Sequence, residues 1–271
     1  MLKIYLPMVI SLCVVSTSAS AHGTVFSPGP ETVFKGGYEF HTDIHREKSG
    51  NEQEDEIGTE VAYGITADWL VGIGAHYSFL KEEGERNDGF GNLELSTKYR
   101  FWRNDMLAAQ ESLALLGDIT LDTARDHPDP APSEGATDAQ IGLAYGYESL
   151  KWQRWASARY RYNGENDEAV DRGDQVFVDA AVGYRPKPPE YYAVDTMWLL
   201  ELNSEFTQRD EQAGINFRNS GGTELFLSPG FFVTYRNAAL KGGVQIPVYS
   251  DLNGQQDASD YRFNLVAEWH F

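Results

Sequence analysis

Polarity alternates from residue to residue through twelve runs of the chain, and turn residues separate the runs. A run of roughly ten residues with period two forms a β-strand that has one apolar face and one wet face, and a tilted strand of that length spans a bilayer. The runs lie at Val33–Ile44, Ile57–Ala67, Trp69–Leu80, Asn92–Trp102, Leu107–Leu121, Asp138–Ser149, Trp152–Asn163, Gln175–Arg185, Tyr192–Thr207, Gly222–Arg236, Ala238–Tyr249 and Asp260–Phe271. They predict an all-β transmembrane antiparallel barrel of about 12 strands.

The last run shows the alternation most clearly. From Tyr261 to Phe271 every odd position is apolar or aromatic, and Trp269 stands two positions before Phe271. An aromatic pair in this arrangement resembles the strand by which outer-membrane barrels are recognised for assembly, so we expect Trp269 and Phe271 to be the membrane-assembly signal and the barrel-assembly machinery to be a partner. The alternative is the edge strand of a soluble β-sandwich.

The connections alternate in length. Short ones follow every second run, around Asp68, Arg103–Asp105, Leu150–Lys151, Pro186–Pro189 and Asn237. Long polar ones follow the other runs, among them His45–Glu56, Lys81–Gly91, Asp122–Thr137 and Gly164–Asp174. Short periplasmic turns and longer outer loops are typical of outer-membrane barrels. Because the number of strands is even, the N- and C-termini should both lie on the periplasmic side.

The first residues predict export. Lys3 precedes an apolar stretch from Ile4 to Val15, and Ala19-Ser20-Ala21 closes it, which is the layout of a cleavable signal peptide. The predicted domains are therefore a signal peptide at residues 1–21 and an outer-membrane barrel at residues 22–271. The single cysteine, Cys13, lies in the part that is removed, so the exported chain would contain no disulfide.

Composition agrees with a barrel. Removal of residues 1–21 takes away one basic residue and leaves 21 basic and 41 acidic residues, a net charge near −20, which argues against nucleic acid as a partner. The mean hydropathy of −0.45 is low because only every second residue of a barrel strand contacts lipid. Aromatic residues make up 13% of the chain, and interfacial girdles use such side chains.

On each predicted strand, the face opposite the apolar one carries polar side chains, and these include both acidic and basic residues. The residues that we expect to line a pore are Glu94, Lys98, Arg100, Arg159, Arg161, Glu201 and Glu205. A lumen of ion pairs that holds the barrel in shape is the alternative interpretation. Eight strands enclose little more than side chains and roughly sixteen leave an aqueous channel, so twelve permit a narrow or gated pore. Pro229 and Pro247 lie inside strands, and each should mark a bulge or bend.

Three segments resemble the family of outer-membrane proteins named after the meta-pathway of phenol degradation, a broad set of transporters. Residues 89–101 (GFGNLELSTKYRF) are similar to its G-x-G-D-x-x-x-x-x-K-Y-R-F stretch, with Asn92 where Asp is usual; the others are Leu227–Phe231, which leads into Leu240–Tyr249, and the closing strand. The resemblance implies a barrel and transport of small compounds, hydrophobic or aromatic ones among them. It implies no catalytic residue.

Two enzyme hypotheses compete with transport. An outer-membrane phospholipase or lipid A deacylase would need a Ser-His pair. His76 and Ser78 lie on the same face of the predicted strand Trp69–Leu80, but that face should point into the lumen. A mature N-terminus at His22 could chelate copper if a second His lay on a soluble sandwich. No Gly-rich phosphate loop, Cys/His metal spacing or paired-carboxylate motif stands out, so no enzyme activity and no cofactor are expected.

The sequence therefore predicts a Gram-negative outer-membrane channel or transporter that passes a small-molecule solute. The other hypotheses are a membrane-bound hydrolase and a structural barrel with a closed lumen. Outer-membrane lipid and lipopolysaccharide are the expected surroundings. The acidic outer loops would stay solvated and bridge to lipopolysaccharide phosphates through divalent cations, or would concentrate cations at the mouth.

Overall fold

The computed structural model describes residues 23–82, 84–124, 135–166, 169–188 and 192–271. Within these ranges all regular structure is strand, and no helix is long and apolar enough to cross a membrane. The strands are β1 (Tyr38–Ser49), β2 (Glu52–Thr66), β3 (Trp69–Glu82), β4 (Glu85–Phe90), β5 (Leu93–Met106), β6 (Ala109–Leu121), β7 (Asp138–Ser149), β8 (Trp152–Tyr162), β9 (Val170–Asp171), β10 (Gln175–Tyr184), β11 (Asp195–Thr207), β12 (Glu211–Gln212), β13 (Ile215–Asn216), β14 (Gly222–Tyr235), β15 (Ala238–Leu252) and β16 (Ser259–His270).

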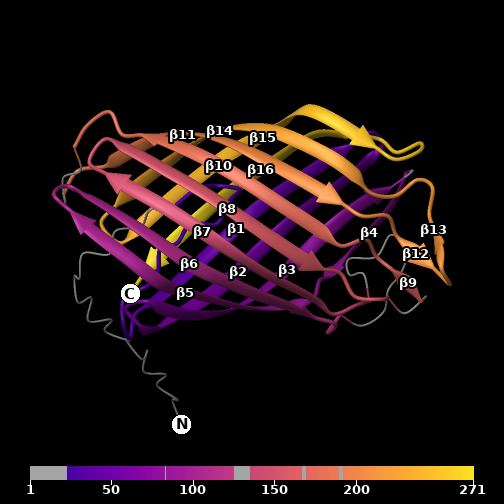
Figure 1. The fold of residues 1–271 in the computed structure, drawn as a ribbon, viewed down its shortest axis with the longest axis horizontal. Helices are drawn as coiled ribbons and strands as arrows, with labels where there is room; N and C mark the ends of the chain where they lie inside the picture. Colours follow the sequence, from indigo (N-terminus) through magenta and orange to yellow (C-terminus); the bar gives the residue numbers. More distant parts are fainter. Residues whose placement is uncertain (1–22, 83, 125–134, 167–168, 189–191) are drawn as a thin grey trace, which may run out of the picture.

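Twelve of these strands form a closed antiparallel ring of tilted strands (Figure 1). Each strand of the ring pairs with its neighbours along the chain, and β1 pairs with both β2 and β16. The ladder between β1 and β16 runs from Glu39↔His270 to Ser49↔Ser259. Beyond it, the main chains of Tyr38 and Phe271 exchange two hydrogen bonds of 3.2 and 2.9 Å. The last strand therefore closes the barrel against the first.

The twelve predicted strands are confirmed, and the bounds of most agree to within three residues. The first is the main exception, because β1 begins at Tyr38 and the residues from Val33 to Gly37 precede it. The predicted loop His45–Glu56 is also wrong. β1 and β2 continue through most of it and meet at a tight turn whose Gly50 has φ 53°. Lys81–Gly91 likewise contains the β3–β4 hairpin. These strands extend past the apolar belt, where polar side chains on both faces conceal the alternation.

The two ends of the barrel differ in the length of the connections between strands. Most connections at the end that holds Tyr38 and Phe271 are short, as at Leu107-Ala108 and Arg236-Asn237, whereas the β10–β11 connection covers residues 185–194. At the other end, the β11–β14 connection contains β12 and β13, which pair with each other and with β9 in a small separate sheet. Apart from the β10–β11 connection and the tight β1–β2 turn at the opposite end, the segregation of loop lengths agrees with the sequence prediction, and it identifies the end with mostly short turns as the periplasmic one.

An apolar belt covers the outer face of the ring. The side chains of this belt are large, apolar and exposed, and they include Ile73, Leu95, Leu143, Val178, Leu200, Leu202 and Leu240. Glu111 is an acidic exception beside the short β5–β6 turn, where it accepts a hydrogen bond of 3.1 Å from the hydroxyl of Tyr145. An exposed apolar band on a closed barrel contacts lipid. The predicted signal peptide lies outside the described residues.

The belt leads to a depth-dependent prediction. Leu200 is near the middle of β11, and Phe206 lies near its outer end on the same face. Leu200→Arg should lower the free energy of unfolding by about 2–4 kcal/mol, and Phe206→Arg should lower it by about 0–1 kcal/mol. Denaturant unfolding in lipid vesicles measures both values. Equal losses at the two positions would contradict this assignment of the belt.

Candidate functional site: the lumen and its N-terminal plug

The segment before β1 folds back into the lumen. We call residues Gly23–Phe34 the plug. Val25 packs against Trp155, Met197 and Phe232 on the inner wall. Nearer the periplasmic end, Val33 and Phe34 pack against Ala62 and Leu70. The chain therefore bends at Val25–Ser27, the tip of the plug, and runs from there along the inside of the barrel down to the start of β1.

One carboxylate holds the tip of the plug. Glu201, on the inner face of β11, is 1% exposed. Its Oε1 accepts a hydrogen bond of 2.7 Å from the main-chain N–H of Val25, and its Oε2 accepts bonds of 3.3 Å from Phe26 and 3.2 Å from Ser27. The hydroxyl of Ser27 adds a bond of 2.7 Å. A buried carboxylate is tolerated only with such donors, and bonds to a charged acceptor are strong ones.

Further contacts fix the plug along its length. The indole N–H of Trp155 donates a hydrogen bond of 2.7 Å to Glu31, and the hydroxyl of Thr32 donates one of 2.8 Å to the carbonyl of Ala67. Gly64 on β2 permits the close approach of the two main chains, because a Cβ there would lie 2.2 Å from the carbonyl oxygen of Phe34. The plug is thus attached to the wall at several heights.

The plug fills only part of the lumen. A lower cavity of about 600 Å³ lies beside it, and an upper cavity of about 450 Å³ lies beyond its tip. A third cavity of about 200 Å³ lies against the outer ends of β5 to β8, and we call it the middle cavity because it shares lining residues with both of the others. Asp118 and Gln140 line both the lower and the middle cavity, Arg161 lines both the middle and the upper one, and Arg159 lines both the lower and the upper one. Because neighbouring cavities share lining residues, they adjoin one another through the height of the barrel.

All seven residues that the sequence singled out lie on the inner face, in three groups. Lys98 and Arg100 line the lower cavity, Glu94 lines the middle one, and Glu205 lines the upper one. Arg159 and Arg161 lie where cavities adjoin. Glu201 instead holds the plug. Arg100 lies at the periplasmic end, since its guanidinium contacts the carboxylate of Asp68 at 2.8 Å and the carbonyl of Ala67 at 2.8 Å.

Two arginines of β8 differ in how they are held. Arg159 contacts Asp179 at 3.0 Å, and Asp179 also accepts hydrogen bonds from Ser157 and Asn203. Arg161 makes no ion pair within 4.0 Å to the described residues. Both guanidiniums lie over the ring of Phe177, at 4.7 and 5.6 Å from its centre. Arg159 is therefore a fixed charge, whereas Arg161 presents its charge to the cavities.

Arg262 contacts several acidic residues at the outer end of the upper cavity. Its guanidinium contacts Glu205 at 2.8 Å, Glu47 at 3.0 Å and Glu224 at 3.8 Å. It also lies 4.6 Å from the centre of the Phe226 ring. These carboxylates come from β1, β11 and β14, so one cation from β16 joins strands that lie on both sides of it in the sheet.

The positions of His76 and Ser78 bear on the hypothesis of a membrane-bound hydrolase. His76 and Ser78 both lie on β3, but the hydroxyl of Ser78 is fully buried and has no hydrogen-bond partner among the described residues. The imidazole of His76 lies 4.0 Å from Glu56 instead. Within the described ranges no group of three or more His, Cys, Asp or Glu residues could hold a metal ion. His22, the proposed copper ligand, lies outside the described residues.

Sequence reasoning missed the plug and three wall residues, Asp118, Asp138 and Gln140. The wall residues could have been found, because all three occupy inward positions of the alternation in β6 and β7. The plug carries no such pattern, and its partner Glu201 is 174 residues from Ser27 along the chain. The predicted Pro247 bend is confirmed by a register shift between Leu225 and Phe226, opposite Pro247.

A closed twelve-stranded ring with an apolar outer belt and a polar, partly filled lumen defines an outer-membrane β-barrel. The family described as "Putative MetA-pathway of phenol degradation" matches residues 78–263, and the chain belongs to this family. No curated protein matches the sequence.

Solved structures share the fold at low sequence identity. The COG4313 outer membrane channel from Pseudomonas putida F1 has a TM-score of 0.73 and 12% identity, with 90% of this chain and 99% of that one covered. The NanC porin has a TM-score of 0.50 and 10% identity, covering 85% and 98%. The β domain of the Bordetella autotransporter BrkA has a TM-score of 0.50 and 13% identity, covering 88% and 100%.

Proposed function

We propose that this protein is an outer-membrane channel that passes small solutes between the plug and the wall formed by β5 to β8. The observation that carries the proposal is the series of adjoining cavities through the height of the lumen. The three cavities have volumes of about 200 to 600 Å³, which restricts the route to small molecules. The channel and the porin among the similar structures support the same function.

The plug is the restricting element of this channel. It occupies the side of the lumen next to Glu201 and Trp155, so the solute path runs along the opposite side. Loss of the Glu201 carboxylate leaves three main-chain N–H groups without their acceptor. Buried donors without a partner are costly, and the tip would leave the wall.

Charges on the path set its selectivity. The middle cavity is lined by the carboxylates of Glu94, Asp118 and Asp138 and by the guanidinium of Arg161. Asp138 is paired with Arg172, so Glu94 and Asp118 supply the excess negative charge. A narrow section with an excess of one sign favours the opposite ion. We therefore expect a preference for cations, and Arg161 moderates it.

We also propose that the protein acts without catalysis. The buried, unpartnered hydroxyl of Ser78 supports this proposal, and release of fatty acid from phospholipid vesicles by the purified protein would sink it. Trp269 and Phe271 are exposed on the outer face of the closing strand, where they are available as the signal for the barrel-assembly machinery. Unchanged yields of folded barrel after deletion of Phe271 would contradict that role.

The plug prediction concerns conductance. Glu201→Ala should raise the mean single-channel conductance in planar bilayers by about threefold or more, because the released plug widens the path. Glu205→Ala is the matched control, since Glu205 lies on the same face of β11 and contacts Arg262 rather than the plug. A barrel that folds but conducts no current in either form would instead favour a structural role with a closed lumen.

The selectivity prediction uses the middle cavity. Glu94→Gln should lower the cation-to-anion permeability ratio by about twofold, and Arg161→Gln should raise it by a similar factor. Reversal potentials in a salt gradient measure both ratios. Shifts in the same direction, or none, would show that ions do not pass these two side chains.

A further inference from the structure

Basic side chains follow one another across the outer ends of β1 to β4. In the strand register the consecutive partners are Lys48 of β1, Gln53 of β2, Lys81 of β3 and Arg86 of β4. We call these four residues the basic row. The row belongs to the outward face of the barrel, because Lys48 is an even number of residues from the exposed Ile44, and side chains on a strand alternate between the two faces.

The basic row lies at the outer edge of the apolar belt. Lys48 is ten residues beyond Tyr38, where β1 begins, and Lys81 is twelve residues beyond Trp69, where β3 begins. With a rise of about 3.3 Å per residue and a tilt of about 40°, these side chains lie roughly 25 and 30 Å from the periplasmic ends of their strands, and the belt is about 25 Å tall. The row is therefore at the height of the headgroups of outer-leaflet lipids.

The same edge is uncharged on four other strands. The outward residues nearest the outer ends of β7, β8, β10 and β11 are Ala139, Tyr162, Val176 and Phe206. The chain as a whole is acidic, with 41 acidic and 22 basic residues. A row with two lysines and an arginine therefore stands out from both its surroundings and the net charge, and it favours an anionic partner on one side of the barrel.

Two cations of the row lack an acidic partner among the described residues. Lys48 lies 3.7 Å from Asp260, but Lys81 and Arg86 make no ion pair within 4.0 Å to the described part of the chain. They are direct partners across the β3–β4 hairpin. Like charges in this position repel each other, and their side chains begin about 5 Å apart. One bound anion would contact both side chains and offset the repulsion.

Aromatic rings lie next to these two cations on the belt side. The ring of Tyr77 is 5.1 Å from that of Phe79 and 5.0 Å from that of Phe90, which is 72% exposed. The hydroxyl of Tyr77 donates a hydrogen bond to Asp88, the acidic residue on the outward face of β4. This carboxylate is thus engaged within the protein, and the rings form an apolar surface directly below the free cations.

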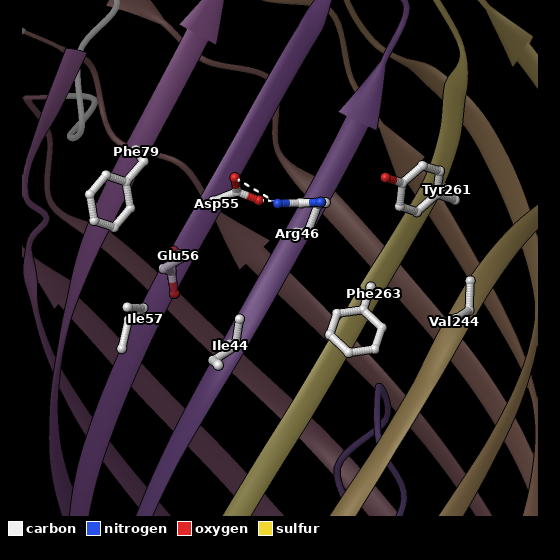
Figure 2. A pocket seen from close by; sticks show the side chains of 9 residues that line it. All are labelled: Ile44, Arg46, Asp55, Glu56, Ile57, Phe79, Val244, Tyr261 and Phe263. Atoms are coloured by element: carbon white, nitrogen blue, oxygen red, sulfur yellow. Dashed lines mark hydrogen bonds and ion pairs between the residues drawn. The ribbon is translucent and has the colours of Figure 1, made fainter. Parts of the chain in front are cut away.

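An apolar groove continues this surface toward β16. Its volume is about 680 Å³, and its apolar lining consists mainly of Ile44, Ile57, Phe79, Val244 and Phe263. Figure 2 shows Ile44 and Ile57 side by side on β1 and β2, with the Arg46–Asp55 ion pair beyond them toward the outer ends of these strands. Pockets of about 300–1,000 Å³ hold ligands of drug size, so the groove has room for an acyl chain.

We propose that the outer face of β1 to β4 binds the lipid A part of lipopolysaccharide, with Lys81 and Arg86 on one phosphate and an acyl chain in the groove. Lipid A joins phosphate groups to several acyl chains, and cations above an apolar surface match both parts. The basic row makes this contact directly, without the divalent cations that acidic loops would need. The site faces lipid rather than the lumen, so it goes beyond the proposed channel function and does not depend on it.

The test pairs two lipids with two variants. The purified barrel in detergent is titrated with lipid A or with dephosphorylated lipid A in the presence of EDTA, and native mass spectrometry measures the bound fraction. Lys81→Gln/Arg86→Gln should weaken binding of lipid A by about fivefold or more and leave binding of the dephosphorylated lipid unchanged. The control Lys151→Gln/Arg154→Gln removes two cations that lie over tyrosine rings near the short β7–β8 turn, and it should change neither affinity.

A second variant tests the groove. Ile57→Trp fills it and should weaken binding of both lipids by about threefold or more, since less apolar surface is buried. Leu143→Trp on β7 is the matched control, because Leu143 and Ile57 are both 48% exposed. It should leave both affinities unchanged.

Three results would overturn the proposal. The first is equal binding of lipid A and dephosphorylated lipid A by the wild type, or an equal loss in the control variants. The second is binding of phosphatidylglycerol as tight as that of lipid A, which would remove lipid A as the specific occupant. The third is binding that requires Mg²⁺ and survives Lys81→Gln/Arg86→Gln, which would assign recognition to the acidic loops instead.

Discussion

The rest of the structure depends on ring closure. A strand in lipid has no water to satisfy its main chain, so every strand must find a partner on both sides. The main chains of Tyr38 and Phe271 and the long β1–β16 ladder provide the final pairing. Lipid around the closed ring requires an apolar outer face, with Glu111 as an exception near a turn, so most charges of this acidic chain lie in the lumen or beyond the belt.

The lumen accommodates those charges by pairing them across strands. Arg159 with Asp179, Lys241 with Glu268, and Arg262 with its three carboxylates hold the wall from within. Glu201 is different, because its partners are the N–H groups of a segment that belongs to no strand. The buried carboxylate of Glu201 needs hydrogen-bond donors, and the N–H groups of the plug supply them. This need therefore holds the plug against the wall. The interior is both a scaffold of ion pairs and a narrowed path, so the two interpretations of the polar face are compatible.

The sequence predicts the wall much better than the lumen. Alternation and turn residues are local, and they place twelve strands and the inner position of residues such as Glu94 and Arg161. The outer ends of β1 and β2, at residues 45–56, were missed. Water contacts both faces of these strands there, so their side chains do not alternate between apolar and polar. The plug was missed because Pro28, Gly29 and Pro30 suggest only a loop, and its burial comes from contacts with Glu201 and Trp155 far along the chain.

Hydrogen exchange at the tip of the plug tests the central claim most directly. In lipid nanodiscs, the amides of Val25, Phe26 and Ser27 should exchange as slowly as those of the barrel strands, because each donates to the buried Glu201 carboxylate. Peptide mass spectrometry over residues 23–31 measures this rate. Exchange of these amides within seconds, while β10 and β11 stay protected, would contradict a plug that is held in the lumen.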